Sequence, residues 1–143
     1  MILAILYFMH LAGIIIMVGS VAVIDVFGLV ARNSRRWTRN TIEAHYITKP
    51  MIWVGAIITS LSWILLLGEI EFDGYALAKT VLLPLLLLNG AFLSFYISPI
   101  LSKQRGEEKL LPKSLQLKIA VSFVVSLLLN WSFVLLTAIM WGR

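Results

Sequence analysis

The sequence predicts an all-α integral membrane protein, a bundle of four transmembrane helices with both termini on the outer side. Of its 143 residues, 60% are hydrophobic and 13% are charged, whereas a soluble domain has about 45–50% apolar and about 25% charged residues. The mean hydropathy is +0.95. A spanning helix needs roughly 20 apolar residues, so four spans use most of the length. We therefore expect residues 1–143 to form a single transmembrane domain without a separate soluble domain.

Four apolar segments account for the predicted helices, at about residues 2–31, 42–68, 75–101 and 117–142. The first has no formal charge before Asp25 and lacks the basic start and cleavage site of a signal peptide, so we expect an uncleaved membrane helix. We place the start of the second helix near Thr41, whose hydroxyl is suited to cap it. The third segment contains Lys79 near its start, and the fourth is free of charge from 119 to 142.

The charges of the three connections predict the orientation. The first connection has five basic residues and one acidic residue, the second has three acidic residues, and the third has five basic and two acidic residues. Short loops rich in Lys and Arg stay on the cytoplasmic side, so the first and third connections are predicted inside and the second outside. The basic clusters lie at a membrane surface. We therefore expect them to attract anionic lipid rather than to bind nucleic acid.

The composition also excludes several kinds of functional site. The chain has no cysteine, so it has no disulfide, thiolate metal site or iron–sulfur cluster. It has two histidines, which cannot form a three-histidine zinc site. The remaining candidates are the ionisable residues inside the spans, because each costs a few kcal/mol to place there.

Polar residues share one face of each predicted helix. At 100° per residue, His10 and Asp25 lie on the same face of the first helix, with Gly13 close by. Small and polar stripes of this kind are where membrane helices approach one another, so they are packing seams, functional surfaces or both. The stripes on the other helices are Thr48, Gly55, Thr59 and Ser62, then Lys79, Gly90 and Ser94, then Ser122, Ser126 and Asn130.

His10 and Lys79 are predicted to lie at similar depths, in the outer half of the membrane. An imidazole is a good axial ligand for iron in a tetrapyrrole, and an ammonium suits a tetrapyrrole carboxylate or serves as a proton donor. The alternative for His10 is a hydrogen bond to a carbonyl or to a hydroxyl such as that of Ser62 or Ser132. The alternative for Lys79 is a side chain that snorkels to the outer surface.

His45 is predicted at the cytoplasmic end of the second helix, about 20 Å deeper than His10 by helical rise. That separation excludes ligation of one haem by both histidines within a subunit. Asp25 lies deeper than His10, and we expect it to form a structural ion pair with Lys49, His45 or Arg32 rather than a proton relay. Trp63 and Trp141 are predicted to belong to the aromatic belt at the outer interface.

Three segments resemble the HemJ-type protoporphyrinogen oxidases and the wider CopD-like membrane domains. They are the His-containing segment 9–12 with Gly19, the Lys-Pro-Met-Ile-Trp-Val-Gly segment 49–55, and the lysine followed by a Leu/Val run at 76–82. The sequence departs from the family pattern at 15–17, where the family has a tryptophan, at 24–26, where it has Pro-Arg, and at 88–92, where it continues with aromatic residues and histidines.

The resemblance implies association with haem b or a porphyrin. His10 would then be the metal ligand, and Lys79 would be a cofactor-binding and catalytic residue. As an enzyme, the protein would oxidise protoporphyrinogen and pass electrons to a membrane carrier, in the cytoplasmic (inner) membrane of a prokaryote. The alternatives are a non-catalytic accessory subunit of a larger membrane complex, or an oligomeric permease for metal ions or small solutes.

A single cysteine tests the predicted orientation. Asn33→Cys introduces the only thiol of the chain, in the first connection. We expect an impermeant thiol reagent to leave it unlabelled in intact cells and to label it after permeabilisation, because this connection faces the cytoplasm. Labelling in intact cells would show that the orientation is inverted.

Overall fold

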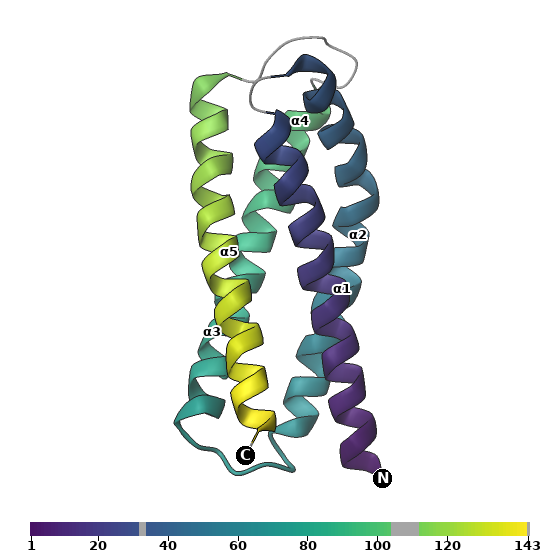
Figure 1. Cartoon of the computed structure of the whole chain (residues 1–143), viewed down its shortest axis with the longest axis vertical. Helices are drawn as coiled ribbons and strands as arrows, with labels where there is room; N and C mark the ends of the chain where they lie inside the picture. Colours follow the sequence, from purple (N-terminus) through teal and green to yellow (C-terminus); the bar gives the residue numbers. More distant parts are fainter. Residues whose placement is uncertain (32–33, 104–111, 143) are drawn as a thin grey trace.

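The computed structural model describes residues 1–31, 34–103 and 112–142, and over these residues its regular structure is entirely helical. Four helices are long and apolar enough to cross a membrane, which confirms the predicted all-α membrane architecture. Figure 1 shows them as neighbouring rods, with both termini and the α2–α3 connection at one end. We call this the outer end, following the predicted orientation, and the opposite end the inner end. The elements are α1 (Ile2–Ala31), α2 (Arg35–Leu66), α3 (Gly74–Ala91), the π-helix η1 (Phe92–Ile97), α4 (Ser98–Lys103) and α5 (Lys113–Trp141).

The second helix begins before the predicted residue. It starts at Arg35 rather than near Thr41, because the arginine-rich segment has good helix formers and no proline or glycine to stop it. Thr41 therefore lies inside the helix and is not its first capping residue. Its hydroxyl instead donates to the Phe27 carbonyl of α1, at 3.0 Å. Arg32 and Asn33 lie outside the described residues.

The third span begins with an N-terminal cap, Asp73, that was not predicted. Asp73 precedes α3, and its carboxylate accepts hydrogen bonds from the amides of Tyr75 and Ala76, at 3.0 and 2.9 Å. It thereby satisfies two donors that a helix start leaves without partners. The span is continuous from Gly74 to Lys103, with η1 as a π-helical insertion between α3 and α4.

The predicted polar stripes face the interior of the bundle. Large apolar side chains cover the outside of all four spans, as expected where the surrounding solvent is lipid. The polar members of the stripes on the second, third and fourth spans are 0–7% exposed. The interior polar residues are His10, Ser20, Thr38, Thr48, Thr59, Ser62, Lys79, Ser94, Ser122, Ser126, Asn130 and Thr137.

The bundle consists of two pairs of helices. One pair is α1 and α2, and the other is α3 and α5; the first pair is packed more extensively than the second. The backbones of α1 and α2 touch at Gly13 and Gly55. A Cβ atom added at Gly13 would lie 2.7 Å from the amide nitrogen of Thr59, and one added at Gly55 would lie 2.5 Å from that of Met17. Only glycine permits this approach at the two positions, as in other small-residue membrane seams.

Replacement of Gly13 by alanine tests this contact. Gly13→Ala should lower the free energy of unfolding by about 1–3 kcal/mol, the usual cost of overpacking, as measured by SDS titration of the purified protein. Gly19→Ala is the matched control on the same helix, because a Cβ there meets nothing within 4 Å. Equal stability of the two variants would contradict the close approach of α1 and α2.

Candidate functional site

His10 is fixed by hydrogen bonds from α1 to α2. Its Nδ1 lies 3.2 Å from the Thr59 carbonyl oxygen and 3.0 Å from Ser62 Oγ. A carbonyl only accepts, so Nδ1 carries the hydrogen. The Ser62 hydroxyl donates to the Ile58 carbonyl at 2.7 Å, which leaves its oxygen free to accept from His10. Of the two hydroxyls expected near His10, Ser62 is the partner, whereas Ser132 is exposed.

The other imidazole nitrogen has no hydrogen-bond partner. His10 is 1% exposed, and its Nε2 is buried without a partner. An imidazole whose Nδ1–H is held by a carbonyl and whose Nε2 is bare has the arrangement found in metal-ligating histidines. Among the described residues, however, no group of three or more His, Asp or Glu is placed to hold a metal ion. A metal ion bound to His10 would therefore need most of its ligands from a cofactor rather than from these side chains.

Lys79 is enclosed rather than snorkelling. Its side chain is 2% exposed, and Nζ lies 4.5 Å from the ring centroid of Trp63 and 5.0 Å from that of Phe133. The imidazole of His10 packs on the same two rings, with centroid distances of 5.6 and 6.1 Å. The structure thus brings His10 and Lys79 together around one aromatic pair. Within the described part of the chain, no carboxylate lies within 4.0 Å of the Lys79 ammonium.

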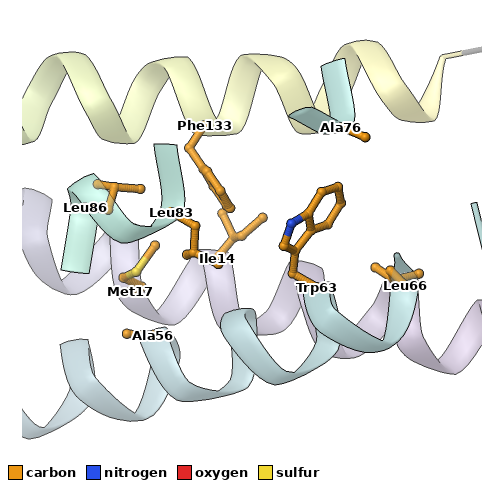
Figure 2. Packing of buried hydrophobic residues seen from close by; sticks show 9 residues of the cluster. All are labelled: Ile14, Met17, Ala56, Trp63, Leu66, Ala76, Leu83, Leu86 and Phe133. Atoms are coloured by element: carbon orange, nitrogen blue, oxygen red, sulfur yellow. The ribbon is translucent and has the colours of Figure 1, made fainter. Parts of the chain in front are cut away.

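Trp63 does not belong to the outer aromatic belt, and that prediction was wrong. It is 3% exposed, because its indole N–H reaches Thr80 Oγ1 at 3.2 Å in the neighbouring helix and so needs no interfacial water. Trp141 is 42% exposed near the outer end, as expected. Phe133 was not singled out from the sequence, although it follows Asn130 by three residues on the polar stripe of α5. Figure 2 shows Phe133 reaching from α5 towards Ile14.

His45 is far from this cluster. His10 contacts Thr59 and Ser62, and Thr59 follows His45 by 14 residues along α2. At 1.5 Å per residue this corresponds to about 21 Å, in agreement with the predicted depth difference. The two imidazoles therefore serve different parts of the bundle.

Of the expected ion pairs of Asp25, those with Lys49 and His45 are not formed, and the one with Arg32 lies outside the described residues. Over the described residues, no basic side chain lies within 4.0 Å of the Asp25 carboxylate. Lys49 is engaged elsewhere, because its ammonium donates to the Ser94 carbonyl of η1 at 3.0 Å and lies over the Phe95 ring at 5.7 Å. Asp25 instead lines the interior together with His45.

Two adjoining cavities occupy the inner and central parts of the bundle. Their volumes are about 110 and 60 Å³, and both are lined by Ile24, Asp25, His45 and Leu93. Neither is lined by His10 or Lys79. The polar residues divide accordingly into a closed outer cluster around His10 and Lys79, and an open inner chamber around Asp25 and His45.

Replacement of Trp63 by leucine tests whether this side chain is buried in the outer cluster. Trp63→Leu should lower the free energy of unfolding by about 2–4 kcal/mol, because it removes a large buried ring, its hydrogen bond and its contact with the Lys79 ammonium. Trp131→Leu is the control, since Trp131 is 63% exposed on α5, and should change stability little. Chemical unfolding followed by circular dichroism measures both. Similar effects of the two substitutions on stability would contradict the burial of Trp63 and would support its original assignment to the membrane interface.

Comparison with protein-family models, curated proteins and solved structures finds no match to this chain. The resemblance to HemJ-type oxidases therefore remains a prediction based on short motifs.

Proposed function

We propose that this chain is a haem- or porphyrin-associated small integral membrane protein, with His10 as the ligand of the tetrapyrrole metal. The observation that carries the proposal is the imidazole of His10. Its Nδ1 is held by the Thr59 carbonyl and its Nε2 is buried without a partner. A buried polar atom without a hydrogen bond costs about 1–3 kcal/mol, and an external partner for Nε2 would offset this cost.

Lys79 supports the same proposal. A buried ammonium without a carboxylate partner is costly inside a membrane, and its two aromatic contacts offset only part of that cost. A tetrapyrrole carboxylate would supply the missing counter-charge. The bound group would also supply the redox chemistry, and a HemJ-like oxidase would use it to oxidise protoporphyrinogen and pass electrons to a membrane carrier. In that reaction, Lys79 would hold a substrate carboxylate.

The donor chemistry of the outer cluster fits a tetrapyrrole, but its packing is closed. Trp63 and Phe133 lie against both His10 and Lys79, and neither cavity reaches His10. A macrocycle therefore requires these two rings to move. This requirement makes pigment binding a demanding test of the proposal.

The closed packing favours a second candidate function, that of a non-catalytic accessory subunit. In this alternative, Nε2 of His10 and the ammonium of Lys79 belong to a structural cluster. The apolar outer surfaces of the helices would contact lipid, further copies of the chain or a larger membrane complex. For either function we propose the cytoplasmic membrane of a prokaryote as the location.

The visible spectrum of the detergent-purified protein separates the two functions. The first function predicts a Soret band that His10→Ala abolishes or shifts and that His45→Ala leaves unchanged. The reason is that Thr59, which His10 contacts, lies about 21 Å from His45 along α2. Size-exclusion chromatography of each variant confirms that it is folded. A colourless parent protein, even after incubation with hemin, would favour the accessory subunit. Pigment that survives His10→Ala and is lost in His45→Ala would refute the assignment of the ligand.

A further inference from the structure

The inner chamber has the composition of a ligand site. Apolar side chains such as Ile24, Leu93 and Phe123 form most of its walls, and only a few polar groups interrupt them. Small-molecule sites in proteins have this character, with a few polar groups that fix the orientation of the ligand. The chamber therefore suits an occupant that is itself largely apolar.

Three side chains of the chamber, those of Asp25, His45 and Asn130, have polar atoms to offer to a ligand. His45 Nε2 is buried without a hydrogen bond, and Asp25 has no basic partner within 4.0 Å among the described residues. Asn130 is 4% exposed. Its amide nitrogen donates to the Ser126 carbonyl at 2.8 Å, while its Oδ1 has no partner. Imidazole, carboxylate and amide together offer both donors and acceptors to a ligand.

The charge of the walls limits what this ligand can be. Among the side chains that the structure describes, no lysine or arginine lines either cavity, whereas Asp25 lines both. A phospholipid phosphate, a fatty acid or a porphyrin carboxylate would face the Asp25 carboxylate here. The Lys49 ammonium is already bound to the carbonyl of Ser94, which lines the smaller cavity. The Asp25 carboxylate therefore favours an uncharged head group over an anionic one.

Size limits the ligand further. The two cavities, of about 110 and 60 Å³, are smaller than the roughly 300–1,000 Å³ of pockets that enclose drug-sized ligands. They suit a single ring rather than a macrocycle. The apolar surfaces of the surrounding helices would allow a long apolar tail to remain in the lipid.

We propose that the inner chamber binds the head group of an isoprenoid quinone or quinol. This ligand has one uncharged ring, two oxygens that accept hydrogen bonds as a quinone or donate them as a quinol, and an apolar tail. The ring lies between Asp25 of α1, His45 of α2 and the η1 segment around Leu93. The inference goes beyond the tetrapyrrole proposal, because no part of it requires a ligand at His10.

Quenching of tryptophan fluorescence by ubiquinone-1, a short-tailed quinone, tests the proposal on the purified full-length protein. Trp53 lines the chamber, so we expect saturable quenching in addition to the linear quenching caused by quinone dissolved in detergent. Trp53→Phe should remove most of the saturable part. Quenching that stays linear at all concentrations would overturn the proposal.

Two pairs of variants locate the site. Ala120 lines the chamber, whereas Ala138 on the same helix lines neither cavity. Ala120→Phe should therefore raise the apparent Kd about tenfold or more, and Ala138→Phe less than twofold. His45→Gln should weaken binding by about tenfold through loss of one good hydrogen bond, whereas His10→Gln should leave it unchanged. Circular dichroism establishes that each variant is folded, and His45→Gln keeps the test valid if Ala120→Phe does not fold.

Other outcomes would contradict the assignment. Equal Kd values for Ala120→Phe and Ala138→Phe, or equal losses for His10→Gln and His45→Gln, would place the quinone elsewhere. Saturable binding of oleate with an affinity above that of ubiquinone-1 would refute the argument from charge. A colourless protein that binds ubiquinone-1 would support the quinone site while refuting the tetrapyrrole proposal, so the two proposals fail separately.

Discussion

The close contact of α1 and α2 at Gly13 and Gly55 is the constraint on which the rest of the arrangement depends. Two glycines allow the helix backbones to touch, where any added Cβ atom would clash with backbone. This contact brings His10, one turn before Gly13, against the Thr59 carbonyl one turn after Gly55. A wider separation of the helices would remove the hydrogen bonds that fix the imidazole. The imidazole of His10 would then lose the orientation in which its Nε2 has no hydrogen-bond partner.

The same constraint explains the difference between the two halves of the bundle. In the outer half, close helix packing and the rings of Trp63 and Phe133 fill the interior around His10 and Lys79. In the inner half, Lys49 is tied to η1, and the interior around Asp25 and His45 remains open. Ionisable residues in a membrane are retained mainly for function. The closed pair of His10 and Lys79 and the open pair of Asp25 and His45 are therefore assigned two different functions.

Sequence periodicity could predict the four spans and the helix faces, because the lipid-facing side of each helix must be apolar and the small and polar residues must then face inward. It could also predict the depths of His10, Lys79 and His45, since helical rise is constant. The sequence could not reveal that Trp63 is internal, because this depends on a hydrogen bond to Thr80 in another helix. The π-helix at Phe92–Ile97 and the chamber beside it also escape prediction, since both arise from packing between helices.

Nitrogen-15 NMR of the two histidines tests the central claim most directly. The chain has only two, so selective labelling gives two imidazoles, and His45→Gln assigns the remaining signals to His10. The account predicts that His10 Nδ1 carries the hydrogen and is hydrogen-bonded, while Nε2 is bare. A His10 ring with its hydrogen on Nε2, or one that exchanges freely between both tautomers, would contradict the contact of α1 with the Thr59 carbonyl and the functional proposal built on it.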